Sequence, residues 1–349
     1  MPETIDFTNL SKQEILDFAK PTKEYEEIMS IWPPLKINWN DHKSAIAKLR
    51  TQTELADEMD EPDPLVKETI QKFSARDGYQ LSLRIFTSVS SSDSGSVIVL
   101  YHGGGWCMGS TTMVADIARN LVKKFRVTVI APKYRLAPEF PWPRSLEDGW
   151  DALEFVRENH AVQGKGFVIG GISAGASMSL VYAHLARDRG LEPKMTGIWS
   201  ACGSARAKDL GDLEDGYRER LLSRSQEECV KNPVLSPEMQ RLLRECVKAD
   251  ENSQWYNSLV WRDGSDDKSG YGHHGLPKVY QQLCGRDVSR DEGLILDDML
   301  KKEGTGTRLD LYRGLPHCFW IALPHVPEFK RWEKDTIDGF GWLLEVSQL

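Results

Sequence analysis

Short apolar runs alternate with amphipathic stretches from about residue 80 to the end of the chain. The run VIVLY at 97–101 contains no charged residue, which is typical of a strand buried on both faces of a parallel sheet. Similar runs predict further strands at 81–86, 126–131, 166–170, 195–201, 277–284 and 308–313. Helical patterns lie between most of them, at 112–124, 145–158, 174–188, 290–303 and 335–346. This alternation predicts an α/β fold with a mostly parallel central sheet and helices on both faces.

Two regions depart from the alternation. The first has a capping box at Ser11-Lys-Gln-Glu14 and a helical stretch at 41–58, so we expect an N-terminal helical segment over 1–75 and a main domain over 76–349. The second, at about 204–275, is charged and rich in helix formers. An insertion of this size predicts a helical cap over a binding site. The alternative is a helical excursion on the surface with no role in binding.

Composition narrows the class of protein. The 349 residues carry a formal net charge of −8 with acids and bases interspersed, which argues against nucleic acid or an anionic membrane as partner. No apolar run approaches the roughly 20 residues of a membrane span, and the first residues lack the pattern of a secretory signal. The chain has six cysteines without CxxC spacing: Cys107, Cys202, Cys229, Cys246, Cys284 and Cys318. Such scattered cysteines predict the reduced thiols of a cytoplasmic protein and no disulfide or zinc framework.

A GxSxG motif lies at the junction of a predicted strand and helix. Gly171-Ile172-Ser173-Ala174-Gly175 follows the strand at 166–170 and begins the helix at 174–188. In this context the motif forms a tight turn that exposes a nucleophilic serine, and side chains at the glycine positions would collide with the backbone. The helix N-terminus adds partial positive charge where an oxyanion forms. Ser173 is therefore the candidate nucleophile; an ordinary glycine-rich turn is the alternative.

A serine nucleophile needs a base to accept its proton. Among the eight histidines, His317 has the best setting, in a loop directly after the strand predicted at 308–313. His273 and His274 lie in a glycine-rich stretch and are interpreted as loop residues. The surroundings of the other histidines are helical or superficial and carry no catalytic signal.

The base needs a carboxylate that orients it. Asp287 follows the strand predicted at 277–284, thirty residues before His317. Asp291 and Glu292 are alternatives, but they lie where the next helix begins, and acids commonly cap that end of a helix. We therefore favour Asp287.

The stretch LYHGGGWCMG at 100–109 supplies a further part. Three consecutive glycines are costly to order, so a slack surface loop is one interpretation. The other is a surface of backbone N–H groups that approach a substrate oxygen without obstruction from side chains. Its position after an early strand favours the second interpretation.

Several motifs occur together and in a fixed order. They are HGGGW at 102–106, YRLAPEFPWPRSLEDGWDAL at 134–153, GISAG at 171–175, GRDVSRDEG at 285–293 and GLPHCFW at 314–320. From about residue 80 onward the chain resembles the hormone-sensitive-lipase branch of the α/β-hydrolases, which includes carboxylesterases, arylacetamide deacetylase and the gibberellin receptors. The resemblance implies the α/β-hydrolase fold, with the N-terminal helices and the insertion at 204–275 as a cap over the acyl pocket.

The resemblance also implies roles for single residues. Ser173 would be the nucleophile, Asp287 the orienting acid and His317 the base. The oxyanion hole would consist of the backbone amides of Gly104, Gly105 and Ala174. His102 would brace the loop that carries the two glycines.

The chain departs from the family pattern at three positions. Ile172 replaces a frequent acidic residue, Ala176 a frequent glycine and Cys318 the usual glycine. The first two departures are similar to variants in esterases of fungal secondary metabolism. We expect Ile172, Cys318 and Trp106 to contact substrate. The alternatives are core packing for Trp106 and, for Cys318, a small residue that merely fits beside the base.

The expected function is hydrolysis of a carboxylic ester of a small, largely apolar molecule through an acyl-enzyme, with no metal or organic cofactor. One alternative uses the same site for acyl transfer, lactone chemistry, elimination or cyclisation on a secondary metabolite. The other is a non-catalytic small-molecule receptor, although the gibberellin receptors lack the catalytic histidine. A homodimer is left open.

Overall fold

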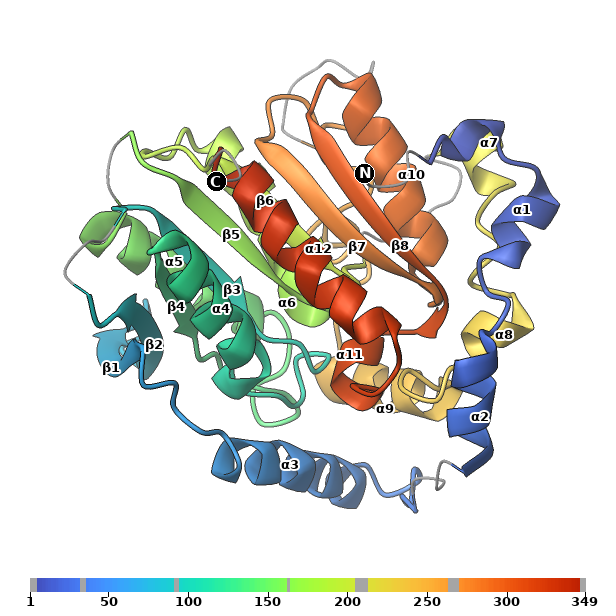
Figure 1. Cartoon of the computed structure of the whole chain (residues 1–349), viewed down its shortest axis with the longest axis horizontal. Coiled ribbons are helices and arrows are strands. Elements are labelled where there is room, and N and C mark those ends of the chain that lie inside the picture. The colour runs from blue at the N-terminus through green and yellow to red at the C-terminus, as the bar shows by residue number, and fades with distance from the viewer. Residues whose placement is uncertain are drawn as a thin grey trace.

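Eight strands form a single sheet at the centre of the molecule (Figure 1). The computed structural model describes residues 5–31, 36–90, 94–161, 164–204, 213–262 and 270–345. Across the sheet the strand order is β1-β2-β4-β3-β5-β6-β7-β8. Along the chain the strands are β1 (Val66–Ser74), β2 (Gln80–Ser88), β3 (Val97–Tyr101), β4 (Thr128–Pro132), β5 (Phe167–Ile172), β6 (Gly197–Ala201), β7 (Lys278–Arg286) and β8 (Thr307–Pro316).

The pairing of the strands confirms the predicted mostly parallel sheet. The strands from β3 to β8 run parallel to their neighbours, whereas β1 and β2 add an antiparallel edge next to β4. Every residue of β3, β5 and β6 is buried. Burial on both faces explains why these strands appear in the sequence as apolar runs without alternation.

Helices cover both faces of the sheet, as predicted. One apolar cluster joins the sheet to α4 (Ala115–Phe125), α11 (Phe319–Ala322) and α12 (Glu328–Leu343). A second cluster joins its other face to α5 (Arg144–Asn159), α6 (Ala174–Asp188) and α10 (Arg290–Lys302). Figure 1 shows α4 and α12 across the near face of the sheet and α6 behind it. The predicted α/β fold with a mostly parallel sheet is confirmed.

The strand β1 is absent from the predicted elements. Its residues lie in the segment expected to be helical, yet they pair with β2 along their whole length. Only the residues near its two ends, Val66 and Phe73, are buried. The sequence VKETIQKFS at this sheet edge therefore lacks the apolar alternation that predicts a strand.

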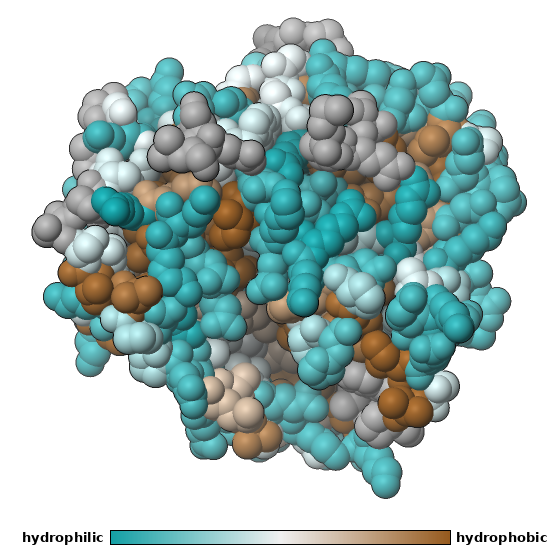
Figure 2. Space-filling model, in the orientation of Figure 1, coloured by the Kyte–Doolittle hydropathy of each residue, from teal (hydrophilic) through white to brown (hydrophobic). Residues whose placement is uncertain are grey.

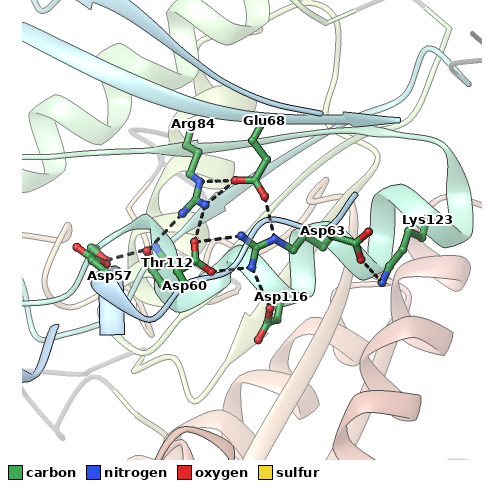
Figure 3. A network of polar contacts seen from close by, with 10 residues as sticks. Asp57, Asp60, Asp63, Glu68, Arg84, Thr112, Asp116 and Lys123 are labelled. Carbon is green, nitrogen blue, oxygen red and sulfur yellow. Dashed lines mark hydrogen bonds and ion pairs between the residues drawn. The ribbon is translucent and has the colours of Figure 1, made fainter. Parts of the chain in front are cut away.

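Ion pairs attach the antiparallel edge to the helix layer (Figure 3). Arg119 of α4 contacts Asp60 at 2.7 Å and Glu68 of β1 at 2.8 Å. Arg84 of β2 contacts the same two carboxylates at 2.6 and 2.5 Å. Lys123 of α4 contacts Asp63 at 2.7 Å. The chain between the N-terminal helices and the sheet is thus held by charges from three elements.

The N-terminal helices and the insertion lie side by side. The first group is η1 (Phe7–Asn9), α1 (Lys12–Asp17), α2 (Lys23–Ile31) and α3 (His42–Glu58), and the insertion contributes α7 (Asp215–Arg218), α8 (Glu227–Val230) and α9 (Pro237–Val247). Arg220 donates hydrogen bonds to backbone oxygens of Phe7 and Thr8, and α3 shares an apolar cluster with α9. In Figure 1 the blue helices α1 and α2 run beside the yellow helices α7 and α8.

This contact is compatible with a joint cap, and the division at residues 75 and 76 stays a prediction. Residues 205–212 and 263–269 of the insertion lie outside the described residues. Within the described ranges, every helix is too short or too polar to span a lipid bilayer. The face in Figure 2 is mainly hydrophilic, and its hydrophobic residues gather in separate patches.

Candidate active site

Ser173 lies on a sharp turn between β5 and α6. Its backbone has φ 54° and ψ −116°, a strained conformation that a non-glycine residue rarely adopts. A Cβ on Gly171 would lie 2.6 Å from the carbonyl oxygen of Tyr101, and one on Gly175 only 2.2 Å from the same atom. Both glycines of the motif are therefore required by close approach of β3, as the sequence motif predicts.

Two hydrogen bonds connect Ser173 to a histidine and an acid. The Oγ of Ser173 is 2.8 Å from Nε2 of His317, and Nδ1 of His317 is 2.5 Å from Oδ2 of Asp287. His317 directly follows β8, and Asp287 directly follows β7. Because parallel strands end at one edge of the sheet, residues far apart in sequence meet there. The structure thus brings together all three predicted residues.

The electrostatics of this group depend on the contact between His317 and Asp287. Burial disfavours the imidazolium, but the Asp287 carboxylate and its hydrogen bond outweigh burial and raise the pKa of His317 to about 9. Burial also disfavours the carboxylate, yet the charge of His317 and the amide of Ser289, 3.0 Å away, lower the pKa of Asp287. Asp287 is therefore an anion in contact with the imidazole.

The two competing acids have other partners. Asp291 is fully buried against Arg290 at 2.6 Å and accepts hydrogen bonds from the amides of Leu222 and Ser223. Glu292 pairs with Arg224 and accepts a hydrogen bond from Ser204 at 3.1 Å. Both acids hold the insertion to α10 and do not contact His317 in the described structure.

The glycine loop at 102–106 faces the serine turn. Gly103 donates its amide to the sulfur of Met113 at 3.2 Å, whereas the amides of Gly104, Gly105 and Ala174 make no hydrogen bond within the described ranges. Gly104 and Gly105 have φ of 104° and 59°, a region that favours glycine. These three amides are the ones predicted to form the oxyanion hole.

His102 and Tyr134 hold this loop from behind. Their rings stack with centroids 4.1 Å apart, and Nδ1 of His102 lies 2.7 Å from the carbonyl oxygen of Gly103. Burial lowers the pKa of His102 to about 4, so the imidazole is neutral at pH 7. These contacts fit the bracing role predicted for His102.

A cavity of about 670 Å³ opens above Ser173 and His317. Its floor includes Gly105 and Ala174, and much of its wall comes from α9 and the following loop, with further residues from the glycine loop, the start of the insertion and α10. Apolar and polar side chains both contribute to the wall: Trp106, Leu243, Val247, Trp255, Tyr256, Arg224, Gln240, Arg244 and Glu292. Residues of the insertion therefore line the cavity, which is compatible with the predicted cap.

The three residues expected to contact substrate lie in different environments in the structure. Trp106 lines the cavity and packs edge-on against Trp142, with ring centroids 5.9 Å apart. Ile172 is completely buried in the core beneath the sheet, and Cys318 is only 3% exposed. Neither belongs to the cavity wall. The β5 turn points Ser173 outward and Ile172 inward, and Cys318 packs in the same buried apolar cluster as Ile172. Only Trp106 therefore lies where the sequence analysis expects it.

Sequence reasoning missed two contributions to the site. Leu243 of α9 packs on the glycine loop, so a Cβ on Gly105 would lie 2.6 Å from its side chain. Arg50 of α3 donates hydrogen bonds to the carbonyl oxygens of Cys107 and Ala137, at 2.9 and 2.8 Å. The amphipathic pattern of both helices could show a buried face, but it could not show which loop that face covers.

His273 lies in a loop, as interpreted from the sequence, but its side chain is buried and has specific partners. It is fully buried, and its Nδ1 lies 2.9 Å from Nε2 of His184. His184 also stacks on Trp261 with centroids 4.5 Å apart. Burial lowers the pKa of both imidazoles, which form a neutral pair that fastens the end of the insertion to α6.

Comparisons with known proteins agree with this geometry. A family model described as an alpha/beta hydrolase fold matches residues 98–321. An AB hydrolase superfamily protein of Schizosaccharomyces pombe is 35% identical over 274 residues, 77% of this chain and 77% of the relative. A versiconal hemiacetal acetate esterase of Dothistroma septosporum is 25% identical over 248 residues, 70% of this chain and 72% of that esterase. Among solved structures, vibralactone cyclase matches with a TM-score of 0.76 and 24% identity, over 94% of this chain and 96% of its own.

Proposed function

Because the chain belongs to the α/β-hydrolase family, we propose that it hydrolyses a carboxylic ester through a covalent acyl-serine intermediate. The predicted resemblance to the hormone-sensitive-lipase branch is confirmed, and the chain is a hydrolase of the carboxylesterase type. The observation that carries the mechanism is the hydrogen-bonded series Ser173, His317 and Asp287 at the floor of the cavity.

In the proposed acylation step, Oγ of Ser173 attacks the ester carbonyl carbon while Nε2 of His317 accepts its proton. Asp287 holds the Nδ1–H of His317 and stabilises the imidazolium that forms. The imidazolium then donates its proton to the oxygen of the departing alcohol. Water repeats the sequence on the acyl-enzyme and releases the acid, so that the serine is regenerated without a metal or organic cofactor.

The negative charge on the carbonyl oxygen needs donors that are already in place. The amides of Gly104, Gly105 and Ala174 are proposed for this role, since Gly105 and Ala174 line the cavity beside the serine and none of the three amides has another acceptor among the described residues. A donor of this kind typically lowers the barrier by about 2.7–4 kcal/mol. The N-terminus of α6 adds partial positive charge at the same place.

The cavity supports a small ester as substrate. Its volume of about 670 Å³ lies within the range of about 300–1,000 Å³ that is usual for sites of drug-sized molecules. Trp106, Leu243 and Tyr256 provide a largely apolar surface for the body of the molecule, whereas Arg224 and Glu292 add a polar side. This wall favours a compact, partly apolar ester.

Product analysis tests the proposal. The chain is incubated with short p-nitrophenyl esters and small aryl acetates, and mass spectrometry identifies the products. Release of acid and alcohol, with covalent labelling of Ser173 by a fluorophosphonate, supports hydrolysis. A cyclised or acyl-transferred product assigns a different reaction to the site, and absence of labelling favours a receptor.

Two further expectations stay proposals about the whole protein. Cell fractionation tests the predicted cytoplasmic location, and light scattering tests the homodimer.

A further inference from the structure

Three of the six cysteines lie together directly beneath His317. Cys202 follows β6, Cys284 lies in β7, and Cys318 follows His317. All three are at most 3% exposed. The sulfur atoms of Cys202 and Cys284 are 3.4 Å apart. Spacing along the chain gives no sign of this cluster, because the three residues come from the ends of neighbouring strands.

Two of these cysteines have a backbone conformation that disfavours any side chain. Cys202 has φ 52° and Cys318 has φ 50°, in the left-handed region where glycine is preferred. The family that this chain resembles usually has glycine at the position of Cys318. This chain therefore has a thiol where the backbone conformation favours a residue without a side chain. Strained residues of this kind gather at functional sites.

The side chains around this point suit a metal ion. The sulfur atoms of Cys202 and Cys318 and a ring nitrogen of His317 all lie within 4.8 Å of one another. In a tetrahedral zinc site with bonds of about 2.0–2.3 Å, ligand atoms lie about 3.5–3.8 Å apart. Small rotations of the side chains therefore close the three ligands around one ion, and Cys284 is within reach of the fourth position.

The catalytic cavity provides the route of entry. Cys202 and His317 both line that cavity, whereas Cys284 and Cys318 lie behind them. An ion that enters from the substrate side meets the sulfur of Cys202 first. Thiolate and imidazole ligands select soft or borderline ions such as Zn²⁺ and Cd²⁺ over Mg²⁺ and Ca²⁺.

We propose that Cys202, Cys318 and His317 form an inhibitory site for a thiophilic divalent metal ion, Zn²⁺ in particular. Binding releases one proton from each of the two thiols and, where His317 is protonated, one from the imidazolium, whose freed lone pair then binds the ion. Nδ1 of His317 otherwise bonds Asp287 and Nε2 bonds Ser173. A metal ion on either nitrogen displaces one of these partners, so zinc and general-base function exclude each other. The site rests on the thiol geometry, and its inhibitory effect rests on the proposed function.

Binding is measured without reference to activity. The Ser173→Ala protein, fully reduced in degassed and chelator-free buffer, is titrated with Cd²⁺ while the ultraviolet Cd²⁺–thiolate charge-transfer band is recorded. We expect saturation at one ion per chain. In this background, Cys318→Gly places a glycine where the backbone is left-handed, so the fold should tolerate it. It should weaken Cd²⁺ binding at least about tenfold, because even the loss of residues that only support the ligands has an effect of this size. Cys246→Ala removes a buried thiol elsewhere and should leave the band unchanged.

Inhibition is then measured in the chain with Ser173 intact. Zn²⁺ should abolish ester hydrolysis reversibly, with recovery on addition of EDTA. In Cys318→Gly, the Zn²⁺ concentration that halves the variant's own metal-free rate should be at least about tenfold higher than in the chain with Cys318. A Cd²⁺ band that Cys318→Gly leaves unchanged, or that Cys246→Ala removes, overturns the metal site. A band with the expected ligands but no esterase activity in any form overturns the proposed function and not the site.

Discussion

At the scale of single residues, two buried acids four positions apart have different partners. Asp287 contacts His317, whereas Asp291 pairs with Arg290 and caps amides of the insertion. We predict that Asp287→Asn lowers kcat about 10⁴-fold, because the amide cannot hold the required tautomer of the histidine. Steady-state kinetics on a p-nitrophenyl ester measure this change.

Asp291→Asn is the matched control. Where folded, this variant should keep the kcat of the wild-type chain. Its free energy of unfolding in urea should fall by about 3 kcal/mol, because the substitution breaks the buried pair of Asp291 and Arg290. If Asp291→Asn loses the chemistry and Asp287→Asn keeps it, the assignment of the acid is wrong.

The pKa of His317 makes a prediction about pH. Only the neutral imidazole can accept the proton of Ser173, and the contact with Asp287 raises its pKa to about 9. The logarithm of kcat/KM should therefore rise with pH and level off above about pH 9, because deprotonation creates the active form. A pH–rate profile of the wild-type chain measures this. A profile that already levels off below pH 6 contradicts the electrostatic account.

At the scale of elements, the glycine loop after β3 depends on the absence of side chains. A Cβ on Gly104 would lie 2.1 Å from the carbonyl oxygen of Met108, so Gly104→Ala must displace the loop. We predict a fall in kcat/KM of about 10²–10³-fold, the loss typical of one oxyanion donor. Kinetics on a short ester measure it.

Gly78→Ala separates this effect from backbone strain. Gly78 also has a positive φ of 81°, but a Cβ there meets nothing within 4 Å. Its activity should equal that of the wild-type chain although its stability falls. Equal losses of activity in the two variants would contradict the role of the loop.

The predictability of the elements follows from their burial. The strand at 97–101 is apparent in the sequence because both of its faces are buried, whereas β1 is not, since most of its residues are exposed at the sheet edge. The strand-to-helix turn at Ser173 could be predicted because two glycines are needed for one close approach.

Contacts between distant segments could not be predicted in the same way. The position of Leu243 over Gly105 and the meeting of Cys202 with Cys318 depend on how the insertion and the strand ends come together. The local pattern of residues in the sequence does not indicate that arrangement. The inward direction of Ile172 likewise follows from the register of β5 and not from its place beside the serine.

At the scale of the whole molecule, the ion pairs of Figure 3 connect the N-terminal segment to the sheet. Arg119 has a side chain only 5% exposed and contacts both Asp60 and Glu68. Since Arg84 remains beside both acids, we predict that Arg119→Ala costs about 2 kcal/mol of unfolding free energy, between exposed and fully buried pairs. Urea denaturation measures it.

Lys123→Ala, on the same helix, is the comparison. Its contact with Asp63 is more exposed and should contribute below about 1 kcal/mol. A smaller loss for Arg119→Ala than for Lys123→Ala would contradict the view that the buried network fixes the N-terminal segment.

The most direct test of the account is the kcat of Ser173→Ala beside that of Ser179→Ala. Ser173 lies on the turn that leads into α6, whereas Ser179 lies inside that helix, is buried and donates its hydroxyl to the carbonyl oxygen of Gly175. On a short p-nitrophenyl ester we predict that Ser173→Ala lowers kcat about 10⁶-fold with an unchanged circular dichroism spectrum. Ser179→Ala should keep wild-type turnover. Undiminished hydrolysis by Ser173→Ala would contradict the covalent serine mechanism.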